Sequence, residues 1–166
     1  MTGSIVGVDT AYRRTGWAAL GVSMTPKLIG YGAIRSTGST RGEQLVSIEH
    51  QFAAVLRSCR PELVIIERPG RWMQRTGSSR DSVELMAMAR GTLLKNCAQS
   101  AITTVEVDFY EVRGKVLGRG NAGEDEVIDF LREIGFDLPV NRVGRIDDDV
   151  ADSIMLALYG ITLTDA

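Results

Sequence analysis

Short apolar runs separated by turn residues are the first clear pattern along this chain. The run SIVGVD at residues 4–9 is nearly all apolar, as in a strand that is covered on both faces. Strand patterns follow at 15–22 and 27–35, separated by Pro26 and glycines at a spacing typical of an antiparallel meander. Residues 62–67 (ELVIIE) and 103–108 (TTVEVD) predict two more strands.

Helical patterns occupy most of the remaining chain. Thr40 and Glu43 fit a capping box, and apolar residues then recur at helical spacing until Pro61. Further helices are predicted at 79–98, 110–117, 125–134 and 148–159. Strands followed by alternating helices and strands predict an α/β fold. The crossovers between parallel strands should be right-handed, which places helices on the faces of the sheet. We expect a mixed five-stranded sheet, three antiparallel then two parallel strands, with helices on both faces.

Length and composition favour one globular unit. The chain has 166 residues, 44% of them apolar, and no repeat or linker divides it, so we expect residues 1–166 to form a single domain. It has neither a run of about 18 apolar residues nor a signal-peptide pattern. We therefore expect a cytoplasmic protein with no membrane partner.

The supply of metal ligands is restricted. Two cysteines without C-x-x-C spacing and one histidine are too few for a thiolate or imidazole site, so any metal must be held by oxygen. Charge is also uneven, since residues 1–123 hold 16 basic against 10 acidic residues and residues 124–166 hold 3 against 11. A solvated acidic face or an acidic metal site beside a basic groove explains that division.

Acidic residues stand where predicted core strands and one helix end. Asp9 and Glu67 are the last residues of predicted apolar strands. Burying a carboxylate there without a partner costs roughly several kcal/mol. Residues 147–149 are three aspartates that enter the last helix, and capping explains them. Capping does not explain Asp152, which shares a helical face with Asp148 and with Asp149.

Two strand-end acids and two acids from one helix face form a hard oxygen site for Mg²⁺ or Mn²⁺. A pair of such ions activates water and stabilises the leaving oxygen in phosphodiester hydrolysis. The pattern therefore favours a metal-dependent nuclease.

The chain resembles the RuvC-type Holliday junction resolvases of the ribonuclease H-like superfamily over nearly its whole length. The motifs that carry the resemblance are 5–9 (IVGVD), 15–17 (TGW), 64–67 (VIIE), 88–91 (MARG), 116–120 (VLGRG) and 149–153 (DVADS). The resemblance implies four catalytic, metal-binding carboxylates: Asp9, Glu67, Asp149 and Asp152. Asp149 fits the D-x-x-D-[AS] pattern, and Asp148 is the alternative.

The resemblance also implies the activity and its partners. It predicts a crossover junction endodeoxyribonuclease that resolves four-way DNA junctions by paired symmetrical nicks, acting as a homodimer. The first and fourth strands should then be adjacent, and the helix at 79–98, with Val83, Met86, Ala87 and Met88, is either the dimer face or a plain core helix.

Departures from the family pattern indicate a divergent or phage-type member. Thr10-Ala11 replaces Pro-Gly after the first aspartate, and Glu124 stands where a lysine is expected. Trp72 or Tyr12 is the candidate for stacking on a base, in place of an apolar residue after Glu67.

The segment 68–80 carries four arginines and no acid, which favours phosphate contact over a merely solvated loop. The predicted DNA-binding residues are Arg13, Arg14, Arg68, Arg71, Trp72, Arg75, Arg80, Arg113, Lys115 and Arg119.

Two other functions remain open at this point. The same chemistry serves a ribonuclease H-like nuclease acting on other branched DNA or on RNA/DNA hybrids. A non-catalytic junction-binding protein would keep the fold, but it has no need for all four acids.

Overall fold

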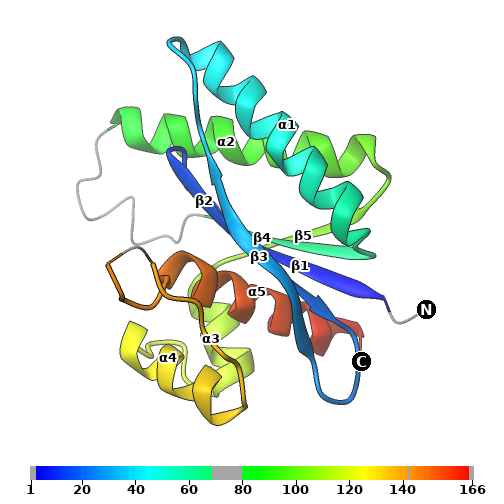
Figure 1. Ribbon diagram of the computed structural model, residues 1–166, viewed down its shortest axis with the longest axis vertical. Coiled ribbons are helices and arrows are strands. Elements are labelled where there is room, and N and C mark those ends of the chain that lie inside the picture. The colour runs from blue at the N-terminus through cyan, green and yellow to red at the C-terminus, as the bar shows by residue number, and fades with distance from the viewer. Residues whose placement is uncertain (1–2, 69–79, 142, 165–166) are drawn as a thin grey trace.

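The computed structural model describes residues 3–68, 80–141 and 143–164 (Figure 1). Its elements, in chain order, are β1 (Ser4–Asp9), β2 (Arg14–Gly21), β3 (Lys27–Arg35), α1 (Arg41–Cys59), β4 (Leu63–Glu67), α2 (Arg80–Gln99), β5 (Thr103–Val107), α3 (Phe109–Leu117), α4 (Glu124–Glu133) and α5 (Asp148–Thr164). In these described ranges, no helix is both long and apolar enough to cross a membrane.

The five strands form one mixed sheet in the order β3-β2-β1-β4-β5. The pairs β1–β2 and β2–β3 are antiparallel, whereas β1–β4 and β4–β5 are parallel. The predicted sheet is therefore confirmed, including the adjacency of the first and fourth strands. This order places the carboxyl ends of β1, β4 and β5 along one edge of the sheet.

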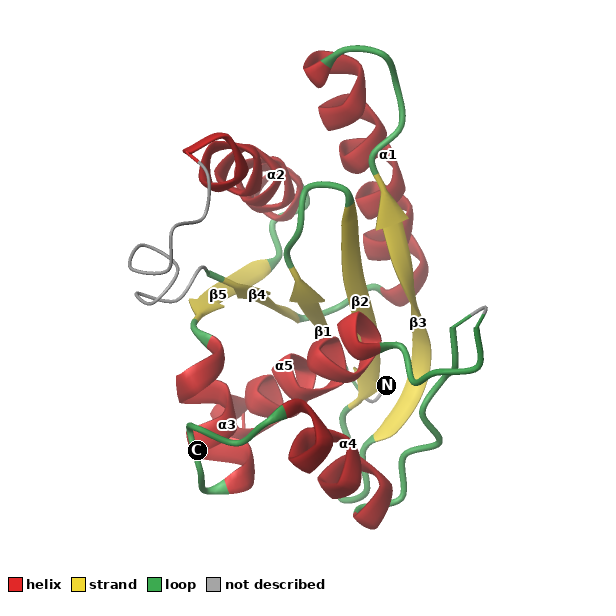
Figure 2. Cartoon of the chain, turned by 90° about the vertical axis from the view of Figure 1, so that its left-hand side faces the viewer, coloured by secondary structure: helices red, strands yellow, loops and turns green. Residues whose placement is uncertain are grey.

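Helices cover both faces of the sheet (Figures 1 and 2). On one face α1 and α2 pack with Phe52 and Leu93 against β1 and β4, where Val6 and Val64 are fully buried. On the other face α5 packs Ile154 against Ile5, with α3 and α4 outside it. The nearly continuous apolar character of β1 and β4 follows from this double coverage.

Helix ends agree with the sequence pattern except at the C-terminus. Thr40 caps α1 through the predicted capping box with Glu43. The last helix was expected to end at Tyr159, but α5 continues to Thr164. That boundary was wrong because Gly160 lies inside the helix, where a Cβ would meet Ile5 and Ile65 at under 3 Å. Its missing side chain allows close packing of α5 on the sheet rather than ending the helix.

Glycines also allow the first half of α5 to approach the sheet closely. A Cβ on Gly7 of β1 would lie 2.0 Å from the Ser153 carbonyl oxygen, and one on Gly16 of β2 would lie 2.5 Å from the Asp149 carbonyl oxygen. The backbone of α5 therefore rests directly on β1 and β2. This contact determines where the acids of its first turns stand relative to the strand ends.

Candidate functional site

Strand pairing brings the carboxyl groups of Asp9 and Glu67 together. In the parallel β1–β4 pair Val8 lies opposite Ile66, so the next residue on each strand is an acid at the same sheet edge. The two carboxyl groups are close enough for each to shift the pKa of the other. The adjacency expected from the sequence is confirmed in the structure.

Helix α5 adds Asp152 to this pair. The Asp152 carboxyl group is partly buried and close enough to Asp9 and Glu67 for their charges to interact. The close contact between Gly7 and the α5 backbone holds Asp152 near the end of β1. Below, the acidic cluster means Asp9, Glu67 and Asp152.

Burial and mutual repulsion make the acidic cluster hard to ionise. Burial, then the hydrogen bond and charge of Glu67, hold the pKa of Asp9 well above its ordinary value, against an opposing effect of Arg14. Burial and the charge of Asp152 raise the pKa of Glu67. Burial and the charge of Asp9 raise the pKa of Asp152 to about 7. Added positive charge would stabilise the ionised form of all three groups.

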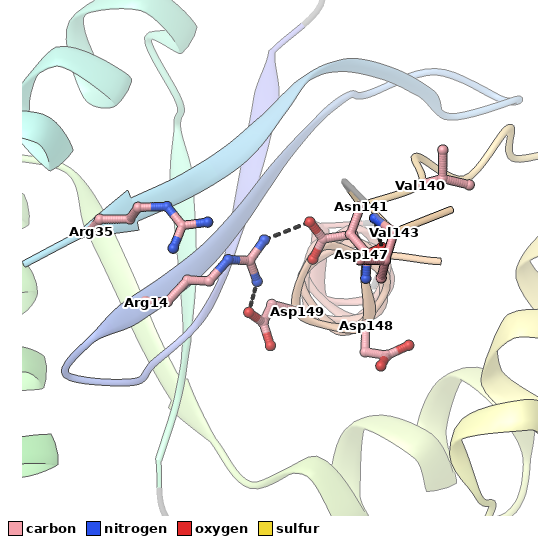
Figure 3. Close-up of a pocket in the computed structure, with 8 residues that line it drawn as sticks. All are labelled: Arg14, Arg35, Val140, Asn141, Val143, Asp147, Asp148 and Asp149. Carbon is pink, nitrogen blue, oxygen red and sulfur yellow. Dashed lines mark hydrogen bonds and ion pairs between the residues drawn. The ribbon is translucent and has the colours of Figure 1, made fainter. Parts of the chain in front are cut away.

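The first turn of α5 does not deliver Asp149 to this cluster. Arg14, the first residue of β2, forms ion pairs with Asp149 and, at 2.5 Å, with Asp147 (Figure 3). Asp148 points away from Arg14 in the same view, and its charge contributes to the raised pKa of Asp152. Of the four predicted carboxylates, the structure therefore brings three together and pairs the fourth with an arginine.

The donor set of the acidic cluster fits a hard divalent cation. Three carboxyl groups from three elements supply only oxygen, which Mg²⁺ and Mn²⁺ prefer. Within the described ranges, no group of three or more acidic, histidine or cysteine side chains is arranged as a ready metal centre. The fit is therefore one of donor chemistry and not of a preformed coordination geometry.

Cationic side chains surround the cluster in different settings. Arg113 of α3 is partly buried, donates to the Ala122 carbonyl oxygen at 2.7 Å and lies 4.7 Å from the centre of the Phe109 ring. Its charge lowers the pKa of both Glu67 and Asp152 against the dominant effect of burial. Arg113 is thus a counter-charge to the acids in the structure, besides its predicted role toward DNA.

The other predicted DNA contacts are exposed or paired with acids. Arg13 and Lys115 are exposed. Arg68 lies 3.5 Å from Asp108, and Arg119 is paired with Glu126. Arg71, Trp72 and Arg75, which were also predicted to contact DNA, lie outside the described residues, as does the side chain of Arg80.

Tyr12 is not available for the base stacking considered from the sequence. Its side chain is only 8% exposed, and its hydroxyl donates to Gln44 Oε1 at 2.7 Å. That expectation was wrong because the turn after β1 folds Tyr12 into the core beneath α1.

Sequence reasoning missed one acid at this edge. Asp108 follows β5, caps α3 by accepting from the Glu111 amide, and contributes to the raised pKa of Glu67. The signal was present, because TTVEVD is a third strand pattern that ends in a carboxylate and β5 runs parallel to β4.

This sheet order, with helices on both faces and acids at the ends of its first and fourth strands, defines the ribonuclease H-like class of α/β proteins. Within that class the chain belongs to the RuvC family: the family model described as "Crossover junction endodeoxyribonuclease RuvC" matches residues 5–159.

Individual relatives are distant but match over nearly their full length. The chain is 28% identical to crossover junction endodeoxyribonuclease RuvC of Synechococcus sp. strain CC9311, covering 94% of this chain and 96% of that protein. The structure of Thermus thermophilus RuvC superposes with a TM-score of 0.80 at 18% identity, covering 98% of this chain and 96% of the other. The same protein in complex with a Holliday junction substrate gives a TM-score of 0.79 at 16% identity, covering 99% and 96%.

Proposed function

We propose that this chain is a metal-dependent endodeoxyribonuclease that resolves Holliday junctions by paired, symmetrical phosphodiester hydrolysis. The observation that carries the proposal is the acidic cluster, in which three carboxyl groups from β1, β4 and α5 meet at one sheet edge. Membership of the RuvC family supports the reaction type, and the described complex of the Thermus protein with a junction supports the substrate class.

Asp9, Glu67 and Asp152 are the residues that would hold the cation, Mg²⁺ or Mn²⁺, with Asp149 as a further ligand. When bound, divalent ions supply an activated water and neutralise charge on the phosphodiester. The protein contributes acids from three elements at one sheet edge and the close backbone contact beneath Asp152. Arg113 limits the repulsion within the cluster before a cation binds.

DNA would approach the edge that carries the strand ends. Arg13 and Lys115 are exposed and suit phosphate contact, as does the predicted segment 68–80. Arg14, Arg68 and Arg119 form ion pairs with acids, so their contacts with phosphate would require an exchange of partner.

A second copy of the chain would supply the second cut. Two symmetrical nicks need two acidic clusters related by the symmetry of the junction, so we infer that a homodimer is the active form. The expected dimer helix α2 has Val83 and Ala87 exposed, while Ala89 and Leu93 on the same helix are in the core. Its exposed apolar side is consistent with a partner copy.

The test is cleavage of end-labelled substrates by the full chain with Mg²⁺, Mn²⁺ or EDTA. The panel contains a four-way junction, a linear duplex, a Y-fork and an RNA/DNA hybrid of matched sequence. We expect nicks on the junction that are lost in EDTA and in Asp9→Asn and Asp152→Asn, with junction binding retained. The exposed Asp137→Asn serves as the matched control and should cut normally.

Each other outcome contradicts a definite part of the proposal. Cleavage of the fork or hybrid in preference to the junction keeps the chemistry and replaces the substrate. Tight junction binding without cleavage under either metal leaves a binding protein and removes the enzymatic proposal.

A further inference from the structure

Arg14 occupies an unusual position between two acids at the start of α5. It forms ion pairs with both Asp147 and Asp149 across 133 and 135 positions of the chain, with the three side chains 26%, 16% and 36% exposed. Figure 3 shows the guanidinium lying between these carboxylates, with Asp148 turned away. Two partly buried partners make this more than a transient surface contact.

The backbone that carries Asp149 has little freedom to move. The close approach of Gly16 leaves no room for it to shift toward β2, and the Ser153 hydroxyl donates to the Asp149 carbonyl oxygen at 2.6 Å. Any change in the partner of Asp149 must therefore come from rotation of its side chain or movement of the guanidinium.

Space for such an exchange is present beside Arg14. A cavity of about 540 Å³ is lined by Arg14, Arg35, Asn141 and the three aspartates of residues 147–149. Asp149 and Asp152 are three positions apart on α5, so rotation of the Asp149 side chain away from Arg14 directs it along the face that carries Asp152. A guanidinium and a divalent cation are thus alternative counter-charges for one carboxylate.

We propose that Arg14 is a positioning residue that competes with the divalent cation for the Asp149 carboxylate, so that the metal site is completed only when Asp149 exchanges partners. This inference rests on the proposed function, because it concerns the same cation site. It assigns to Arg14 control over cation affinity, in addition to any contact that the released guanidinium makes with a DNA phosphate.

The test measures Mn²⁺ binding to the full chain by calorimetry, without DNA and therefore without turnover. The variants are Arg14→Gln, Asp149→Asn, the double variant and Arg14→Lys, each checked for a native circular dichroism spectrum. Arg35→Gln is the matched control, since Arg35 lines the same cavity and forms no ion pair in the described residues.

We expect Arg14→Gln to bind Mn²⁺ about tenfold more tightly than the unchanged chain, and Arg14→Lys and Arg35→Gln to stay within about threefold of it. In the Asp149→Asn background, Arg14→Gln should change the affinity by less than about threefold, because the Asp149 carboxylate for which the two cations compete is absent and only Asp147 loses its partner.

Failure of the competition and failure of the cation site give different results. Equal affinity in Arg14→Gln and the unchanged chain overturns the competition, as does the same tightening with and without Asp149, which would be a general charge effect. Absence of Mn²⁺ binding in every variant overturns the proposed cation site itself, and the inference with it.

Discussion

Asp152 carries a carboxyl group whose ionised form the folded chain disfavours. Burial and the charge of Asp9 raise its pKa to about 7, from an ordinary value of 3.8. Between about pH 4 and pH 7, the Asp152 carboxyl group therefore keeps its proton in the folded chain and has lost it in the unfolded chain. Its contribution to stability is complete below pH 4 and is lost as the pH rises toward 7.

Replacing Asp152 by Asn should remove this pH dependence. In metal-free buffer at pH 8 we expect Asp152→Asn to raise the free energy of unfolding by about 1–3 kcal/mol over the unchanged chain, and by less at pH 5. Urea denaturation in EDTA at the two pH values measures the difference, with Asp137→Asn as control. An equal difference at both pH values would contradict the raised pKa of Asp152.

Divalent cations should stabilise the unchanged chain more than Asp152→Asn. A ligand that binds the folded state alone stabilises it, so Mg²⁺ at pH 8 should raise the melting temperature of the unchanged chain more than that of Asp152→Asn. Thermal unfolding with and without Mg²⁺ measures this difference. If the two proteins shift equally, the cation does not bind at Asp152.

Arg113 and Lys115 lie two residues apart on α3 and should behave differently. Arg113→Gln loses the bond to the Ala122 carbonyl oxygen, the Phe109 ring contact and a counter-charge to the acids, and should destabilise the chain by about 1–3 kcal/mol. Lys115→Gln should leave stability within about 0.5 kcal/mol and reduce the salt dependence of junction binding by about one phosphate contact. Urea denaturation and salt titrations of junction binding distinguish the two variants. A stable Arg113→Gln or a strongly destabilised Lys115→Gln would contradict the structure.

At the scale of elements, the site depends on how closely α5 lies on β1. Gly7→Ala would place a methyl group 2.0 Å from the Ser153 carbonyl oxygen, which requires α5 to move. We expect destabilisation of about 3 kcal/mol or more in urea denaturation. Gly91→Ala on α2 is the matched control, because its Cβ would have no atom within 4 Å, and it should be neutral or stabilising by up to about 1 kcal/mol. Equal effects of the two changes would contradict the close packing.

The sequence was informative where local pattern decides structure. The apolar runs ending in Asp9 and Glu67 predicted strands, and the resemblance placed those strands side by side, as the structure does. The pairing of Arg14 with Asp149 could not be predicted, because it depends on the packing of α5 against β2 over 135 positions. The burial of Tyr12 and the inward role of Arg113 depend on tertiary contacts in the same way.

At the scale of the whole molecule, charge and topology divide the chain. The acid-rich residues after 123 form α4 and α5 on one side of the sheet, whereas α1 and α2 cover the other (Figure 2). The acidic cluster lies at the edge where the ends of β1, β4 and the start of α5 converge.

The proposed homodimer is tested by a charge on α2. Val83 is 40% exposed, so Val83→Glu should not disturb the core, yet a charge in an apolar interface should shift the chain from dimer to monomer in sedimentation velocity. The control is Met24→Glu in the β2–β3 turn, which is fully exposed and should stay dimeric. A dimeric Val83→Glu would place the interface elsewhere.

The central claim is that two acidic clusters cut one junction symmetrically. The direct measurement is cleavage of a supercoiled plasmid that extrudes a cruciform, with Mg²⁺, followed by separation of linear from nicked circular product. Paired cuts within one complex yield linear DNA with ligatable nicks at symmetrical positions, and Asp9→Asn abolishes both cuts. Accumulation of nicked circles alone, or linear product unaffected by Asp9→Asn, would contradict the account.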